Sequence, residues 1–261
     1  PAPMQPGKIR VTTEDELKRF AEIVELGATG IPLTDSTSEE LDELASALVN
    51  LLTTVVKAAG RPARKGGRLA PWWTEDFSSS SAVFKAVRWL KSPGAFQPPP
   101  LQVDNVVFET QMDKANALRQ ATLERRTADD DIDNTWASIS PSRSIPFSNK
   151  ISLDEAQHAT IHTDNTSPGA DNITVNLLKA AWHIIGTHVR RLFEKCLTIG
   201  HHPKPFKEAE VVMIAKPGRR DLTSPRAWRP ISLLSCLGKG LERLIARRLA
   251  WAAVYFGVLH P

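Results

Sequence analysis

The sequence predicts an α-rich α+β fold. Most apolar residues recur at helical spacing, and several of these stretches follow a Ser or Thr with Glu three positions later, the capping box of an α-helix. Two short runs of branched apolar residues, at 210–214 and 229–234, predict strands instead. With 41% hydrophobic residues among 261, the chain has enough apolar side chains to bury a core.

Capping boxes predict two helices near the N-terminus. Thr13–Glu16 and Thr37–Glu40 each pair a hydroxyl with a carboxylate three residues later. The first helix is expected to end at Gly27 and the second at Gly60. The second carries a long apolar stripe: Leu41, Leu44, Ala45, Leu48, Leu52, Val55 and Val56.

The whole of residues 1–150 is expected to be a helical connector interrupted by flexible stretches. Residues 60–70 mix Gly, Pro and basic residues, which favours an exposed linker over a phosphate-contacting loop. The acidic run Asp129–Asp131 is expected to be a solvated linker as well. A further helix is predicted over about 109–126, with Met112, Ala115, Leu118 and either Ala121 or Thr122 on its inward face.

The second half predicts longer helices. Ser152–Glu155 fits a capping box for a short helix, and Asp171 is the expected N-cap of a helical segment over 173–199. Gly186 is expected to divide that segment, and Gly200 to end it.

A basic hairpin and a last helix follow. The strands at 210–214 and 229–234 are expected to pair antiparallel around a turn-rich basic loop. In the helix after them, one face is apolar: Leu237, Leu241, Leu244, Ile245 and Leu249. Three cations are expected on the opposite face: Lys239, Arg243 and Arg247.

Charge is unevenly distributed along the chain. Residues 1–150 hold 18 Lys and Arg against 20 Asp and Glu, whereas 151–261 hold 15 against 9. A local excess of this size is only a weak indication of a polyanionic partner. Two cysteines favour a reducing, intracellular compartment over a disulfide framework. No apolar run approaches the length of a membrane span, and the start at Pro1 without a signal peptide predicts a piece of a longer product.

Two cations are the first candidates for binding chemistry. Lys216 precedes a Pro-Gly turn and Arg229 precedes a Pro on the partner strand, so both are expected at the mouth of the hairpin. A forked guanidinium and a mobile ammonium together neutralise phosphate oxygens, as a nucleoside triphosphate requires. Exposed loops are also commonly charged for solubility, and the residues alone leave both interpretations open.

Other candidate sites are weaker. Cys196 with His201 and His202, and the pair His158 and His162, lack a further ligand at suitable spacing, so no metal site is expected. Three tryptophans are expected to pack in the core or at its edge: Trp182, Trp228 and Trp251. Of these, Trp228 is the one to test for stacking on bases.

Three segments together resemble a known family. "TSPGADNITVNLLKAAW" at 166–182, the long stretch at 201–249 that contains "AKPG" and "WRPIS", and "FGVLHP" at 256–261 are similar, in order and spacing, to the start of non-LTR retrotransposon reverse transcriptases, the long interspersed elements, fungal ones especially. The resemblance implies that residues 151–261 are a partial reverse transcriptase domain, the fingers of a right-handed polymerase.

The resemblance also implies roles for individual residues. Lys216 and Arg229 match the fingers cations that bind the triphosphate of the incoming nucleotide. Residues of the "SPGAD" turn, the hairpin loop and the last helix are expected to contact nucleic acid: Pro168, Gly169, Asp171, Arg219, Arg220, Arg226, Lys239, Arg243 and Arg247. The chain departs from the family pattern at Ala170 and Ala215, where Pro is usual, and at Asn172, where Gly is usual; these changes hint at sequence decay.

Upstream, "PWWTEDF" at 71–77 resembles the segment between endonuclease and polymerase in such elements, so the first helices would belong to the connector.

The catalytic palm is expected to be absent from this chain. Family members hold two Mg²⁺ with carboxylates of a palm strand and of an aromatic-x-Asp-Asp turn, and no such turn is present. We therefore expect no catalytic residue, no bound Mg²⁺ and no polymerisation by this chain alone. The implied partners are RNA template, DNA primer, deoxynucleoside triphosphates and the rest of the polyprotein (endonuclease, palm and thumb), within an intracellular ribonucleoprotein, nuclear or cytoplasmic, without a membrane.

Two other hypotheses remain at this point. The chain is alternatively a non-enzymatic basic module, derived from a retroelement, that binds nucleic acid or protein. It is also conceivable as a poorly folded remnant, since fingers without a palm leave apolar surface uncovered.

Overall fold

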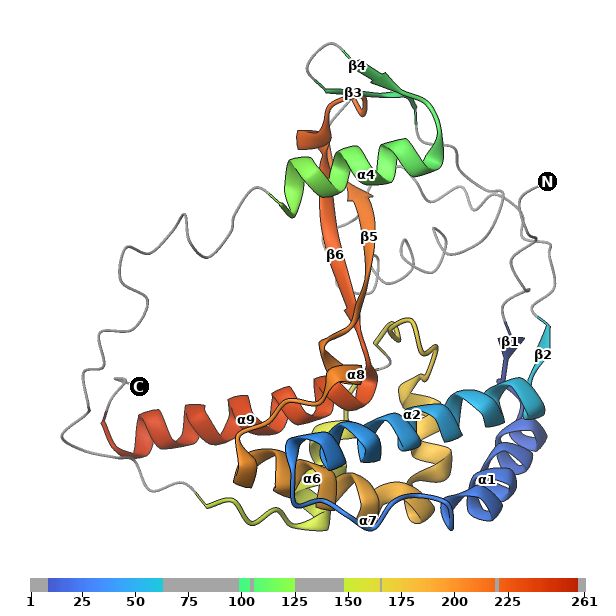
Figure 1. The fold of residues 1–261 in the computed structure, drawn as a ribbon, viewed down its shortest axis with the longest axis vertical. Coiled ribbons are helices and arrows are strands. Elements are labelled where there is room, and N and C mark those ends of the chain that lie inside the picture. The colour runs from blue at the N-terminus through green and yellow to red at the C-terminus, as the bar shows by residue number, and fades with distance from the viewer. Residues whose placement is uncertain are drawn as a thin grey trace. The chain divides into compact units, whose positions relative to one another are not determined.

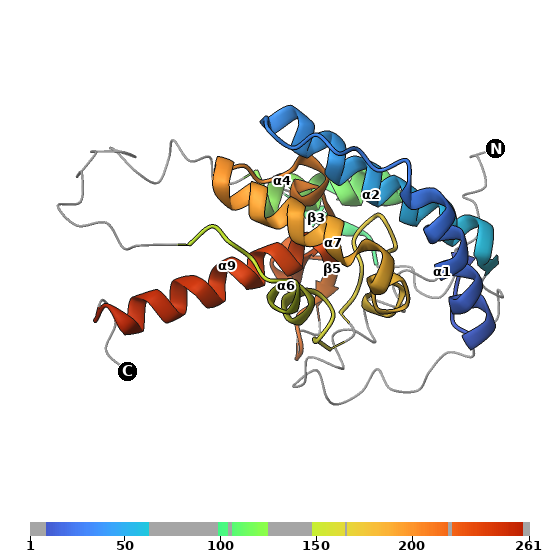
Figure 2. The ribbon, with the colours of Figure 1, turned by 90° about the horizontal axis from the view of Figure 1, so that it is seen from below.

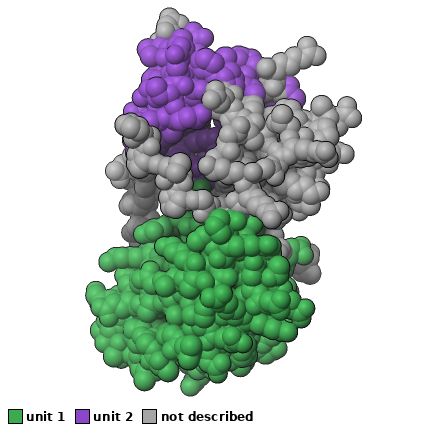
Figure 3. Space-filling view, turned by 90° about the vertical axis from the view of Figure 1, so that its right-hand side faces the viewer, with its two compact units in different colours: residues 1–68, 145–210, 233–261 green, residues 69–144, 211–232 purple. Residues whose placement is uncertain are grey.

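The computed structural model describes residues 9–62, 99–103, 106–124, 148–164, 166–218 and 221–257. The "PWW" segment, the acidic run at 129–133, and Arg219 and Arg220 lie outside these ranges. Two compact units are present (Figure 3): one comprises residues 1–68, 145–210 and 233–261, and the other 69–144 and 211–232. The α-rich α+β class is confirmed, because helices dominate and the strands form small two-stranded sheets.

The two N-terminal capping boxes are confirmed. In α1 (Glu14–Ala28) and α2 (Ser38–Ala59), the Thr hydroxyl accepts the N3 backbone N–H, and the N3 Glu carboxylate accepts the N-cap N–H. Gly60 is the C-cap of α2, as expected. Gly27 lies inside α1 instead of ending it; a Cβ there would lie 2.3 Å from Leu51 Cδ1, so its small size allows α2 to approach.

The described part of the first unit contains three further helices longer than a single turn: α6 (Leu153–Thr160), α7 (Val175–Ile199) and α9 (Cys236–Tyr255). The single turn α8 (Lys204–Lys207) follows α7. Gly200 ends α7 with φ 73°, as expected. Two predictions were wrong. Thr174, and not Asp171, caps α7, and Gly186 does not divide it, since that glycine lies against the Trp182 ring within a continuous helix.

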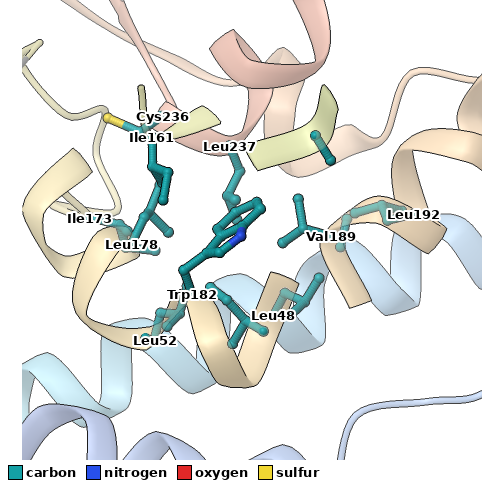
Figure 4. Packing of buried hydrophobic residues seen from close by; sticks show 14 of the residues in the cluster. Leu48, Leu52, Ile161, Ile173, Leu178, Trp182, Val189, Leu192, Cys236 and Leu237 are labelled. Carbon is teal, nitrogen blue, oxygen red and sulfur yellow. The ribbon is translucent and has the colours of Figure 1, made fainter. Parts of the chain in front are cut away.

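One apolar core joins these helices. α1 packs on α2 and α7, and α6 packs on α7 and α9, as the two ribbon views show (Figures 1 and 2). The close-up shows Trp182 of α7 between Leu48 of α2 and Leu237 of α9 (Figure 4). Helices from both sides of residue 150 therefore share one core. The division into a connector (1–150) and a partial polymerase domain (151–261) stays a prediction. Short strands β1 (Ile9–Arg10) and β2 (Arg61–Pro62) pair antiparallel at the edge of this unit.

Two acidic side chains connect the α1–α2 segment to α7 and to the residues that follow it. Asp35, in the loop between α1 and α2, accepts a hydrogen bond from Arg191 and lies 3.3 Å from Lys195 Nζ. Asp42 of α2 lies 2.8 Å from His201 Nε2 and accepts the Lys204 backbone N–H at 2.8 Å. Asp35 thus binds the C-terminal half of α7, and Asp42 binds the segment that follows it.

The second unit is small. β3 (Leu101–Val103) and β4 (Val106–Phe108) form an antiparallel hairpin beside α4 (Gln111–Thr122) and the 3₁₀ turn η1 (Pro225–Ala227). The inward face predicted for α4 was wrong in part, because Met112 and Ala115 are exposed and Ala117 and Lys114 are buried. Among the described residues of this unit, the buried core consists of Leu101, Ala117, Leu118, Ala227 and Trp228.

Within the described residues, no helix combines the length and apolar character that crossing a membrane requires.

Asp35 gives a test of the packing of the first unit. Burial alone would raise its pKa, but the hydrogen bond and charge of Arg191, followed by those of Lys195, outweigh burial and lower the pKa below its ordinary value of 3.8. A carboxylate with a lowered pKa stabilises the fold above its unfolded pKa and loses that contribution as pH falls through its folded pKa. Asp35→Asn is therefore expected to lower the free energy of unfolding by about 1 kcal/mol at pH 7.

The measurement is urea denaturation at pH 7 and at stepwise lower pH, with Asp164→Asn, an exposed carboxylate, as the matched control. The difference between Asp35→Asn and wild type should shrink below pH 3.8. A difference that is the same at every pH would contradict the ion-pair account.

Candidate nucleotide and nucleic-acid interface

The basic hairpin consists of β5 (Ala209–Ala215) and β6 (Trp228–Leu234), which are hydrogen-bonded neighbours. Their arrowheads point in opposite directions (Figure 1). The Lys216 N–H donates to the Ala227 carbonyl over 2.7 Å. Lys216 therefore lies across the hairpin from Ala227, two positions before Arg229. Because of this bond, the two predicted nucleotide contacts share one end of the hairpin. Lys216 is half-buried there and Arg229 is exposed.

The loop that joins the strands is held by local hydrogen bonds. The Asp221 carboxylate accepts from the Thr223 hydroxyl at 2.6 Å and from its N–H at 2.9 Å, and these two bonds lower the Asp221 pKa. Trp228 Nε1 donates to the Leu222 carbonyl at 3.0 Å, and the Gln102 N–H donates to the Thr223 carbonyl at 2.8 Å. These bonds fix the return strand that carries Arg229.

Trp228 is a core residue, 6% exposed, as expected from the sequence. Its ring packs with the described core residues of the second unit, and its Nε1–H donates a hydrogen bond to the Leu222 carbonyl. A stacking role for Trp228 is therefore not supported by its surroundings. Trp182 is also buried, but the prediction for Trp251 was wrong, because that side chain is 59% exposed.

The "SPGAD" turn packs closely on the junction between β6 and α9. A Cβ on Gly169 would lie 2.9 Å from both Leu234 C and Ser235 N, which are backbone atoms that cannot move aside easily. Only glycine allows this approach. Asn172, where the resemblance noted in the sequence leads us to expect Gly, adopts φ 57°, and its side chain donates to the Ala170 carbonyl at 3.0 Å. Asn tolerates the left-handed conformation better than most residues, so the turn is retained.

Asp171 has a local role in this turn. Its carboxylate accepts the Ile173 N–H at 3.1 Å, one residue before the true cap of α7. Pro168 and Gly169 precede it in the same turn. The turn thus leads directly into the first turn of α7.

Two of the three cations predicted to face outward on α9 instead donate hydrogen bonds to backbone carbonyls of the protein. Lys239 Nζ donates to the Ser167 carbonyl at 2.7 Å, and Arg243 Nη1 donates to the Ala159 carbonyl at 2.7 Å. Burial, followed by the positive charge of Arg243, lowers the Lys239 pKa, and the negative charge of Asp171 opposes them. The expectation that both residues line the outer face of the helix was therefore wrong, whereas Arg247 is exposed as expected. Arg226 is exposed on the hairpin loop.

Arg248 is a residue that the sequence interpretation missed. Its guanidinium donates to both oxygens of Glu155, at 2.6 and 2.7 Å, and to the Ser148 and Lys150 carbonyls. Glu155 therefore pairs with α9, although the Ser152 hydroxyl still accepts its N–H. The helical spacing of Leu241, Leu244 and Arg248 would have placed this arginine on the inward face.

The other candidate groups have structural surroundings. Burial raises the pKa of the Cys196 thiol to about 12 and also raises the pKa of Cys236. His158 and His162 lie with their Nδ1 atoms 3.2 Å apart. In the part of the chain that the structure describes, no three His, Cys, Asp or Glu side chains are grouped as ligands for a metal ion.

Sequence comparison relates the chain to retrotransposon proteins. It is 29% identical over 185 residues to a Pol polyprotein from the type-1 retrotransposable element R1 of Bradysia coprophila, covering 68% of this chain and 18% of the relative. It is 43% identical over 83 residues to a probable RNA-directed DNA polymerase from transposon BS of Drosophila melanogaster, covering 32% and 9%. A third relative is the RNA-directed DNA polymerase from mobile element jockey of Drosophila funebris, 40% identical over 81 residues, covering 30% and 8%.

The chain is similar to part of non-LTR retrotransposon polymerases. It spans less than a fifth of the length of each of these curated relatives. No family model matches the chain. The fungal type predicted from the sequence stays a prediction.

Gly169 gives a test of the retrotransposon-like turn. Gly169→Ala would place a methyl group against the backbone of Leu234 and Ser235, so we expect the free energy of unfolding to fall by about 2 kcal/mol. The matched control is Gly30→Ala, whose Cβ would meet its nearest neighbour at an ordinary 3.5 Å. Urea denaturation followed by far-ultraviolet circular dichroism measures both. Equal stability of the two variants would contradict the close approach.

Proposed function

We propose that this chain is a fingers fragment of an RNA-directed DNA polymerase of the non-LTR retrotransposon type. Lys216 and Arg229 bind the triphosphate of the incoming deoxynucleotide. The turn Pro168–Asp171 contacts the RNA template strand. Three arginines of the hairpin loop also contact nucleic acid through their charge: Arg219, Arg220 and Arg226. The DNA primer and the remaining parts of the polyprotein are the other partners.

The observation that carries this proposal is the pair of cations at one hairpin end. The cross-strand bond from Lys216 to Ala227 and the fixed return strand hold the two residues near one another. Between residues 211 and 241, Asp221 is the single acidic residue, and its carboxylate is engaged by Thr223. Such a site suits phosphate, because a guanidinium and an ammonium group both donate charge-assisted hydrogen bonds to phosphate oxygens. The polymerase names of two of the relatives agree with this role.

Mg²⁺ belongs to the intact polymerase in this proposal, and we assign it no ligand in this chain. The described residues bring no suitable set of ligand side chains together. The roles assigned here are binding and positioning.

The proposal is tested by titrating the chain with thymidine triphosphate and following backbone amide resonances. We expect saturable shifts at Lys216 and Arg229, and much smaller ones with thymidine, which has no phosphate. Lys216→Gln with Arg229→Gln should weaken triphosphate binding at least about tenfold, because two charge-assisted contacts are lost. Lys207→Gln, an exposed lysine of the other unit, is the control. Equal shifts with thymidine, or none at the hairpin, would contradict the proposal.

The second candidate is a basic nucleic-acid-binding module without enzymatic function, favoured by the exposure of Arg226, Arg229 and Arg247. Such a module would lose oligonucleotide affinity in proportion to the charges removed and would show no preference for the triphosphate over the free nucleoside.

A further inference from the structure

The last turns of α9 carry an unusual exposed surface. Figures 1 and 2 both show this end of the helix extending past α6 and α7. Ala252 is buried there, but most of the apolar residues are not: Leu249 is 57% exposed, Trp251 59%, Val254 55%, Tyr255 68% and Phe256 42%. Several large apolar side chains exposed together within two helical turns are less common on an ordinary surface than at an interaction site.

Three aromatic rings organise this surface. Trp251 and Tyr255, one helical turn apart, are stacked with ring centres 4.8 Å apart and planes at 16°. Phe256 meets both rings edge-on, with centres 6.5 Å from Trp251 and 5.0 Å from Tyr255. The rings therefore fix one another's orientation while remaining exposed. We call Trp251, Tyr255 and Phe256 the aromatic tip.

The helix that bears the tip is basic. After Glu242 the chain contains no acidic residue, while Arg243, Arg247 and Arg248 follow. Arg243 and Arg248 are engaged by carbonyl groups and by Glu155. Arg247 is exposed, one turn before Trp251 on the same side of the helix, which is the geometry of neighbours at i and i+4.

We propose that the aromatic tip and Arg247 form a binding site for single-stranded nucleic acid. Unpaired bases stack on the exposed rings of Trp251 and Tyr255, and the Arg247 guanidinium binds an adjacent phosphate. The absence of acidic side chains from this end of the helix complements a polyanion. Duplex is disfavoured, because paired bases do not present their faces for stacking. This site adds to the proposed function and does not depend on the hairpin cations.

The experiment measures binding of a fluorescent oligo(dT) and of oligo(U) to the whole chain by anisotropy at several salt concentrations. The double variant Trp251→Ala, Tyr255→Ala should bind about tenfold more weakly at every salt concentration, with the same salt dependence, because stacking is lost and charge is not. Arg247→Gln should reduce the slope of log affinity against log salt by about 0.7, the value for one phosphate contact with a single strand. Leu26→Ala, an exposed apolar side chain of α1, is the matched control and should change neither.

Unchanged affinity in the aromatic double variant, with its circular dichroism spectrum intact, would overturn the proposal. So would equal affinity for duplex and single strand. The alternative is that the aromatic tip binds a second copy of the chain, and sedimentation velocity tests it. A dimer that is lost in the aromatic double variant, with oligonucleotide affinity unchanged, would also overturn the nucleic-acid proposal. Failure of the hairpin assignment is distinguishable, because Lys216→Gln with Arg229→Gln removes triphosphate binding and leaves the stacking contribution intact.

Discussion

The contact between the "SPGAD" turn and the start of α9 is the constraint on which the proposed template contact depends. Gly169 permits backbone-to-backbone approach at Leu234 and Ser235, and Lys239 fastens the preceding carbonyl of Ser167 from the first turn of α9. β6 runs directly into that junction. This contact region thus fixes the turn that is proposed to lie on the template against the start of α9.

Much of the positive charge in the C-terminal half serves this architecture. Lys239 and Arg243 satisfy carbonyl groups, Arg248 joins α9 to Glu155, and Arg191 joins α7 to Asp35. The net excess counted from the sequence therefore overstates the charge available to a polyanion. The cations left on the described surface are fewer and better defined, with Arg229 on the hairpin and Arg247 before the aromatic tip.

Local patterns predicted much of the fold because their physics is local. The capping boxes at Thr13 and Thr37 involve atoms three residues apart, so the sequence contains all that they need. The failures involve partners far along the chain. Arg243 bonds a carbonyl 84 residues away and Lys239 one 72 residues away, and helical spacing alone gives no information about such partners. Trp251 was misplaced for the same reason, since its spacing on the helix does not show where the neighbouring helices stop.

The central claim is that Lys239 positions the turn and does not serve as an outward-facing charge. Hydrogen exchange at the Asn172 and Ile173 amides tests it most directly, because these groups bond Gly169 and Asp171 within the turn. In Lys239→Met, exchange at both amides should be about tenfold faster, equivalent to losing roughly 1.4 kcal/mol from the turn, and Arg247→Gln should leave both rates unchanged. Wild-type exchange rates in Lys239→Met would contradict the account.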